Sequence, residues 1–228
     1  MRHLCFLLAF VFVGLLSSAQ INYFNYEDAL INDNVRSLER DINGNIWIGT
    51  IAGITRFDGT SFTSYTDADG LGGNIVYDIC AHSSGHVYAA TSGGLSVFDG
   101  SVWTNYTIGD GLPSNTIWSV EEDNLNQIWV GTSDIGVSYF DGVNWNPLGV
   151  NDGLISAGVK VIFADRNNNI WFGTGNGLSM YNGSTFKNFN TSTGLPGLLI
   201  NDIIQLYNGN IAIATNGGLG VYNFSSWT

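Results

Sequence analysis

The sequence predicts an all-β protein assembled from repeated four-stranded units. Three observations predict this: a repeat of 41 to 42 residues, an abundance of Gly, and few charges. Of 228 residues, 30 are Gly and only 11% are charged, whereas a typical domain has about 25% charged residues. This composition favours short buried strands joined by tight turns, and a disordered chain would carry more charge and fewer aromatic residues.

The clearest repeated element is an apolar strand that ends in Thr. It begins with Asn45–Thr50 and recurs at residues 86–91, 127–132, 169–174 and 210–215. The terminal Thr steps by 41, 41, 42 and 41 residues. Apolar residues at successive positions are expected where both faces of a strand are covered, as they are when sheets stack.

Three further elements keep the same period. A second strand follows each Thr, and a tight Asp-Gly or Asn-Gly turn ends it, as at Asp58 and Gly59. An aromatic strand comes next, and its centres are Phe62, Trp103, Trp145 and Phe186. A second turn, such as Asp69–Leu71, leads into another apolar strand. Each unit therefore holds four short strands joined by turns in which Gly accepts positive φ.

A four-stranded unit of about 40 residues has the size of one β-propeller blade. The sequence therefore predicts a β-propeller of four-stranded blades, five in number. A linear solenoid is the alternative, although it would need polar capping repeats. The chain enters at residues 23–26 and leaves at residues 226–228 within the same outer strand. This favours a closed ring of five blades, and a segment of a larger ring is the alternative.

The first nineteen residues have the pattern of a signal peptide. Arg2 and His3 precede an apolar run of 13 residues, which is too short for a bilayer span of about 20. Small residues then lead to an expected cleavage after Ala19. We therefore expect a signal peptide at residues 1–19 and a propeller at residues 20–228. The exported chain would be periplasmic or extracellular, with no membrane insertion after cleavage.

The repeat resembles the two-component regulator propeller family. The residues that carry the resemblance are Val35–Thr50, and Leu112–Val120 followed by Ile128–Thr132. The repeats of this family are similar in a central sequence motif, Gly-Asn-Ile-Trp-Ile-Gly-Thr. The resemblance implies a periplasmic or extracellular sensor domain that binds a ligand, often an oligosaccharide. It implies signalling through a kinase as well, but the sequence holds no kinase, response regulator or later membrane-spanning segment.

Residue types that support catalysis are scarce. Cys80 lies in an apolar strand and is expected to be a buried small side chain. His82 and His86 are expected at a hairpin turn, with no metal site. Asp41–Asn45 is expected to be a hairpin turn of the same kind, because a calcium loop of the EF-hand type would need Glu where Ala52 stands. The sequence therefore predicts no catalytic residue, metal or cofactor.

Six Lys and Arg residues follow the signal peptide, and the net charge of the whole sequence is −12. This charge argues against nucleic acid and anionic membranes as partners. The partners that we expect are therefore a small polar ligand, such as an oligosaccharide, or a protein.

One position of the innermost strand differs in every repeat. Its residues are large, and polar or aromatic: Arg36, Tyr77, Trp118, Lys160 and Asn201. We expect them to project into the central channel and bind the ligand, although contacts between blades would explain them nearly as well. The loops after the conserved Thr add weaker candidates, namely Asp134, Asn176 and Asn216.

The sequence thus favours a non-enzymatic ligand-binding module. Two alternatives stay open. One is a glycan lyase or hydrolase on a propeller scaffold, which would need acidic residues and His on one rim. The other is a protein-interaction fragment of a larger surface protein.

Overall fold

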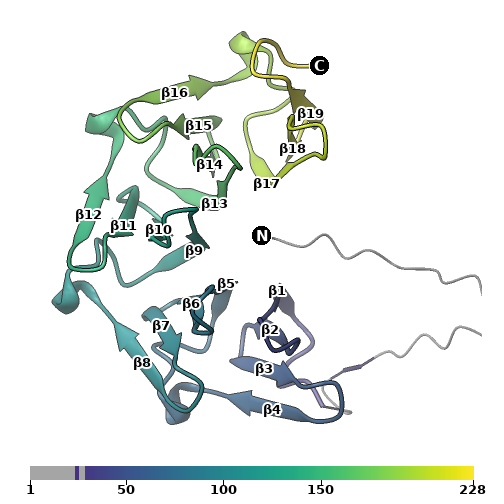
Figure 1. Ribbon diagram of the computed structural model, residues 1–228, viewed down its shortest axis with the longest axis vertical. Coiled ribbons are helices and arrows are strands. Elements are labelled where there is room, and N and C mark those ends of the chain that lie inside the picture. The colour runs from purple at the N-terminus through teal and green to yellow at the C-terminus, as the bar shows by residue number, and fades with distance from the viewer. Residues whose placement is uncertain (1–23, 26–28) are drawn as a thin grey trace, which may run out of the picture.

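The computed structural model describes residues 24–25 and 29–228, which form five antiparallel β-sheets around a common centre (Figure 1). Each sheet is one blade, and its strands follow one another in the chain from the innermost to the outermost. The five-bladed all-β fold predicted from the repeat is confirmed. The expected signal peptide lies outside the described residues.

The strands of the five blades are short. Blade 1 holds β1 (Val35–Arg40), β2 (Ile46–Thr50), β3 (Ile54–Phe57) and β4 (Phe62–Tyr65). Blade 2 holds β5 (Val76–Ala81), β6 (Val87–Thr91), β7 (Gly94–Phe98) and β8 (Trp103–Tyr106). Blade 3 holds β9 (Ile117–Glu122), β10 (Ile128–Thr132), β11 (Val137–Phe140) and β12 (Trp145–Leu148). Blade 4 holds β13 (Val159–Ala164), β14 (Ile170–Thr174), β15 (Leu178–Tyr181) and β16 (Phe186–Phe189). Blade 5 holds β17 (Ile200–Gln205), β18 (Ile211–Thr215) and β19 (Gly218–Tyr222).

The fifth blade has three full strands and the beginning of a fourth. Trp227 forms an isolated bridge with Tyr222, and the backbones of Thr228 and Val221 exchange two hydrogen bonds of 2.8 and 2.9 Å. These residues stand where the outermost strand begins in the other blades.

The first hairpin of a blade is held by a carboxylate. The oxygens of Asp41 accept hydrogen bonds from the backbone N–H groups of Asn43 and Asn45 and from the indole Nε1 of Trp47, at 2.9 Å each. Asp123 and Asp165 repeat this arrangement in blades 3 and 4. The predicted hairpin turn at Asp41–Asn45 is therefore confirmed, and the buried indole N–H has a partner.

Short 3₁₀ helices lie between the blades, where the sequence predicted only turns. They are η1 (Asp67–Asp69), η2 (Ile108–Asp110), η3 (Val150–Asp152) and η4 (Thr191–Thr193). The Asp69 carboxylate accepts a hydrogen bond of 2.8 Å from the backbone N–H of Thr66, and so caps the start of η1. Asp110 and Asp152 make the same bond in η2 and η3. These recurring acids are therefore capping residues.

Most of the hydrophobic core lies between blades. Four buried clusters each join one blade to the next. Gly49 shows how close the approach is, because a Cβ there would lie 2.8 Å from Cγ1 of Val76 and 3.2 Å from Cδ1 of Ile79. A residue larger than Gly at this position would push β5 away from β2.

In blades 1, 2 and 4, a buried hydroxyl on the third strand (β3, β7 or β15) hydrogen-bonds to the outermost strand of the same blade. The Ser179 hydroxyl lies 2.7 Å from Oδ1 of Asn188 and accepts from the backbone N–H of Ile155 at 3.0 Å. Ser138 stands at the same position of blade 3, but its hydroxyl has no hydrogen-bond partner among the described residues. Pro147 lies opposite it in the sheet and replaces the amide partner. Pro113, at the position of Ile155, has no N–H to donate.

The five blades form an open arc, so the closed ring that the sequence favoured is wrong for the described residues. Figure 1 shows the sheet of β17–β19 separated from the sheet of β1–β4. Leu38 on β1 is 61% exposed, whereas Ile79 at the same position of blade 2 is 1% exposed. Leu219 on blade 5 is 69% exposed, whereas its counterpart Leu178 is fully buried. The two end faces of the arc therefore do not cover each other.

Phe24 lies against the outer edge of blade 1. Its ring is 5.1 Å from the ring of Phe62 and 6.0 Å from that of Phe57. Tyr65 makes the equivalent contacts with the next blade, at 5.5 Å to Phe98 and 5.8 Å to Trp103. Phe24 thus occupies the place that an outer strand of a preceding blade would take, as the sequence pattern indicated.

Candidate functional site

The innermost strand of every blade carries a β-bulge at the same place. In blade 1 the pairing with β2 runs from Val35 with Thr50 to Ser37 with Gly49, and Arg36 has no partner. The same shift recurs in the other four blades, where the unpaired residues are Tyr77, Trp118, Lys160 and Asn201. A bulge of this kind redirects a side chain and is common beside functional sites.

The five unpaired residues are the five inner-strand candidates that the sequence singled out, and we call them the bulge array. They come from β1, β5, β9, β13 and β17, which lie nearest the centre in Figure 1. Arg36, Lys160 and Asn201 are exposed, and Tyr77 and Trp118 are half-buried. Contact between blades explains part of their placement, but all five keep surface that solvent reaches.

Two pairs of the bulge array are in contact. The guanidinium carbon of Arg36 lies 5.3 Å from the centre of the Tyr77 ring. The ammonium of Lys160 lies 5.7 Å from the centre of the Trp118 ring. Each pair joins neighbouring blades and has the separation of a cation–π interaction. The array thus reads cation, aromatic, aromatic, cation and amide from blade 1 to blade 5.

The loops after the conserved Thr lie on the same rim as the bulge array, because Thr50 pairs with the residue before the bulge. In each blade the Thr side chain closes its own loop; the Thr50 hydroxyl donates to the carbonyl of Gly53 at 2.9 Å. This hydrogen bond explains the recurring Thr and Gly. It also holds the loop in a defined position beside the bulge.

The three loop candidates differ in how far they are engaged. Asp134 is exposed and accepts a hydrogen bond of 3.0 Å from the hydroxyl of its neighbour Ser133. Asn176 is exposed and donates to Ser156 at 3.4 Å. Asn216 accepts from the backbone N–H of Leu199 at 3.1 Å, so its carbonyl oxygen already has a structural partner.

Asp78 is a residue of this region that the sequence analysis did not select. It follows Tyr77, and its carboxylate accepts from the Ser37 hydroxyl at 3.2 Å and from the backbone N–H of Val120 at 3.2 Å. It therefore connects blade 2 to the innermost strands of blades 1 and 3. The sequence does carry a signal for Asp78, because the residue at this position changes between repeats. The equivalent residues are Ser37, Asp78, Ser119, Val161 and Asp202.

The histidines lie at the other rim. His82 and His86 flank the turn after β5, while Tyr77 stands near its beginning, and five strand residues span roughly 16 Å. The Nδ1 atom of His82 lies 2.9 Å from the backbone N of Ser84, which donates to it, so the ring replaces the turn-forming Asp of other blades. Its Nε2 atom lies 3.3 Å from Glu122 of the next blade. His82 is therefore a residue of the hairpin turn, as expected.

Cys80 lies on the innermost strand β5 and is buried between blades 2 and 3. Burial, and then the carboxylates of Glu121, Glu39 and Asp78, raise the pKa of its thiol well above the ordinary value. A thiol with a raised pKa is a poor nucleophile at neutral pH. Cys80 is thus a small apolar core residue, as predicted.

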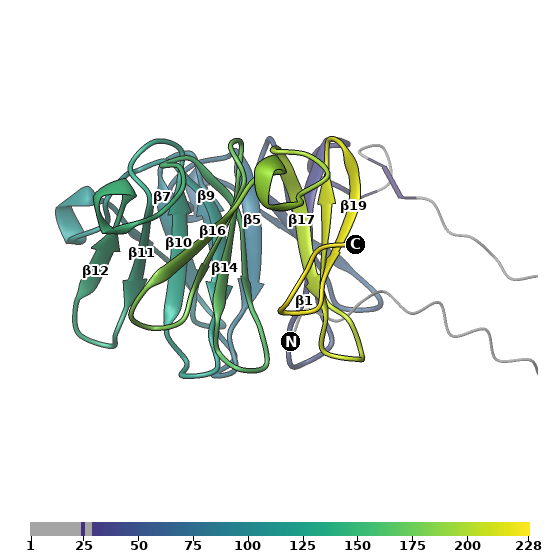
Figure 2. The same cartoon turned by 90° about the horizontal axis from the view of Figure 1, so that it is seen from above.

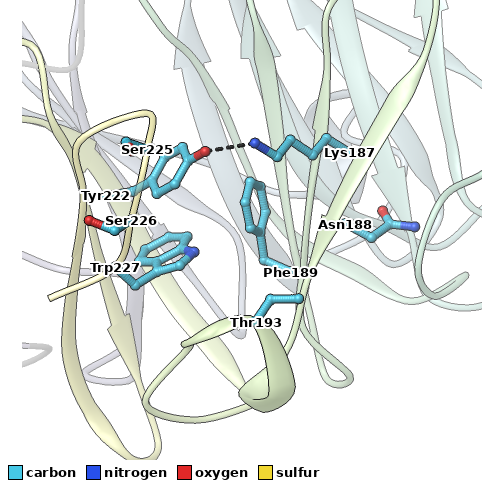
Figure 3. Close-up of a pocket in the computed structure, with 8 residues that line it drawn as sticks. All are labelled: Lys187, Asn188, Phe189, Thr193, Tyr222, Ser225, Ser226 and Trp227. Carbon is cyan, nitrogen blue, oxygen red and sulfur yellow. Dashed lines mark hydrogen bonds between the residues drawn. The ribbon is translucent and has the colours of Figure 1, made fainter.

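One cavity lies outside the bulge array. It has a volume of about 210 Å³ and lies between the outer strands of blades 4 and 5, where Phe189, Tyr222 and Trp227 surround it (Figure 3). The Lys187 ammonium donates to the Tyr222 hydroxyl at 2.7 Å. Tyr65, Phe98 and Trp103 form an aromatic trio of the same kind between blades 1 and 2. The aromatic rings of this cavity are therefore part of the packing between blades.

The strands run between two rims in the side view (Figure 2), and the innermost strands carry the bulge array close to one of these rims. Among the described residues, no group of three or more His, Cys, Asp or Glu side chains could hold a metal ion. Residues 24–25 and 29–228 contain no helix that is long and apolar enough to cross a membrane.

The family model of the two-component regulator propeller matches three segments of the chain, residues 29–52, 111–134 and 153–176. They contain the Trp and Thr strands of blades 1, 3 and 4. No curated protein is similar enough in sequence to match the chain.

Solved structures share the fold at low sequence identity. The extracellular domain assigned to a hybrid two-component system of B. thetaiotaomicron has a TM-score of 0.79 and 23% identity, over 91% of this chain and 31% of that one. A second B. thetaiotaomicron domain, assigned to a one-component system, has a TM-score of 0.74 and 19% identity, over 85% and 30%. The chain therefore spans about a third of the length of these two proteins.

A lyase shares the fold as well. A catalytically inactive virginiamycin B lyase from Staphylococcus aureus, solved with quinupristin, has a TM-score of 0.69 and 14% identity, over 86% of this chain and 69% of that one. Likeness at this level of identity concerns the fold, and the three matched segments concern the repeat. The chain is therefore a β-propeller, and three of its segments match the two-component regulator propeller repeat.

Proposed function

We propose that the chain is an exported, non-catalytic propeller that binds a small polar ligand, such as an oligosaccharide, through the bulge array. The observation that carries the proposal is the β-bulge at one position of all five innermost strands, where the side chain differs in every blade. A structural role would favour the same residue five times, as it does for the conserved Thr. Variation at a re-aimed position is typical of recognition.

Two further points support this proposal. Neighbours with the same fold are extracellular domains assigned to sensor systems, and residues 1–19 have the pattern of a signal peptide. Exposed amide and charged groups beside half-buried rings suit a ligand that has both hydroxyl groups and apolar ring faces. We propose export to the periplasm or the cell exterior on these grounds.

Ligand binding can be measured with a glycan array followed by calorimetric titration. We expect Trp118→Ala and Lys160→Ala each to weaken binding by about tenfold or more, because each removes half of a cation–aromatic pair. Tyr207→Ala is the matched control, since Tyr207 is 100% exposed in the turn after β17, at the opposite rim. Unchanged binding in both array variants would refute the assignment of the site.

The same ligand tests the proposal that the chain has no catalytic activity. After prolonged incubation with the protein, mass spectrometry should recover the bound oligosaccharide intact. A cleaved product, or one with a new unsaturated bond, would favour a propeller-scaffold hydrolase or lyase instead.

A further inference from the structure

The cations of the bulge array stand out in a strongly acidic protein. The sequence has seven Lys and Arg residues against 19 Asp and Glu residues. Two of those seven, Arg36 and Lys160, occupy bulge positions on β1 and β13. Both are exposed, and both lie over an aromatic ring of the neighbouring blade.

Neither cation is neutralised within the part of the chain that the structure describes. Residues 24–25 and 29–228 give Arg36 and Lys160 their ring contacts, and no ion pair or hydrogen bond. A cation–π contact engages the face of the cation and leaves N–H groups free to donate. Free guanidinium and ammonium groups are strong donors to carboxylate and sulfate oxygens.

The carboxylates that follow the array on β5 and β17 differ from the two cations, because they accept hydrogen bonds from other protein groups. Asp78 accepts from the Ser37 hydroxyl and from the backbone N–H groups of Ile79 and Val120, at 3.0 to 3.2 Å. Asp202 accepts from the backbone N–H of Ile203 at 2.9 Å. Hydrogen bonds of this kind stabilise the negative charge where it lies. Within residues 24–25 and 29–228, the two cations of the array have ring contacts but no ion pair or hydrogen bond.

We infer that the ligand of the bulge array is an acidic oligosaccharide, which carries carboxylate or sulfate groups. The inference rests on the proposed function and deepens it. The two rings occupy the middle of the array on blades 2 and 3, with a cation on either side on blades 1 and 4. An extended saccharide with several acidic groups suits this order better than a single small anion does.

Matched pairs of probes test the charge directly. Calorimetric titration would compare trigalacturonic acid with its methyl ester, and a sulfated chondroitin tetrasaccharide with its desulfated form. We expect at least one acidic member to bind about tenfold or more tightly than its partner. The advantage should shrink as NaCl is raised from 50 to 500 mM, because salt screens the attraction.

Charge-removing variants locate the effect. Arg36→Gln and Lys160→Gln should reduce the preference for the acidic member toward unity, because each should weaken binding of the acidic member more than binding of the uncharged member. Lys187→Gln is the control, since Lys187 also lies over an aromatic ring, at 5.2 Å from Phe189, but on the outer strand β16. It should keep the full preference.

Three results would overturn the inference. Equal affinity for both members of each pair, with loss of binding in Trp118→Ala, would leave the proposed function standing and refute the acidic ligand. If Lys187→Gln lost the preference to the same extent as Arg36→Gln and Lys160→Gln, the preference would depend on the overall charge of the protein and not on the bulge array. The absence of binding by any of the four saccharides would refute the acidic ligand, while binding of another sugar on the glycan array would still uphold the proposed function.

Discussion

Leu38 and Ile79 stand at the same position of two successive blades, but only Ile79 is covered by a neighbour. The side chain of Ile79 packs against Gly49 of blade 1 and is 1% exposed. Leu38 is 61% exposed on the end face of the arc. Replacing each by Ala compares one local sequence position with and without a covering blade.

The expected effects differ by several fold. Ile79→Ala removes buried methyl groups and leaves a cavity, which lowers the free energy of unfolding by about 3 kcal/mol. Leu38→Ala removes surface that already faces water, so its effect should stay below about 1 kcal/mol. Ile203→Ala, in fully buried surroundings on β17, should behave as Ile79→Ala does.

Urea unfolding followed by tryptophan fluorescence measures the difference. Midpoints are comparable provided that the dependence on urea keeps the same slope in all variants. A loss in Leu38→Ala as large as that in Ile79→Ala would refute the reasoning, because it would mean that the first blade is covered in solution and the arc is closed.

Two further predictions concern buried polar groups. Ser138→Ala should leave stability unchanged or raise it, because the hydroxyl removed has no partner, whereas Ser179→Ala should lower it by about 1 to 3 kcal/mol by breaking two hydrogen bonds; equal losses in urea unfolding would contradict this. Burial raises the pKa of Asp41, but hydrogen bonds from Trp47 and Asn45 outweigh that effect and hold the pKa below 3.8. A lowered folded pKa contributes stability above about pH 4 that is lost as the pH falls further. Asp41→Asn should therefore flatten the fall in melting temperature between about pH 5 and pH 2, and parallel curves for both proteins would count against it.

Much of the local structure could be predicted from the sequence. The strand that ends in Thr, the turns at Asp58 and Asp69 and the His82 turn all depend on residues a few positions apart. Short-range hydrogen bonds of Asp, Thr and Gly decide such turns, and the repeat displays each of them several times. The residues of the bulge array could also be selected from the sequence, because all five residues at that position of the innermost strand differ.

Other features depended on contacts that a repeat cannot show. The repeat predicts the same covered face in every blade, yet Leu38 and Leu219 are exposed because no blade lies against them. Ser138 lost its partners through Pro113 and Pro147, and only the sheet register brings Pro147 opposite it.

The sequence by itself determined the blade, because its strands and turns arise from interactions within about 40 residues. It also determined the number of blades, through the count of repeats. The tertiary structure alone decided that the arc is open and that Arg36 meets Tyr77 while Lys160 meets Trp118. Those contacts join residues about 41 positions apart on separate sheets, and their geometry follows from how the blades stack rather than from any local pattern.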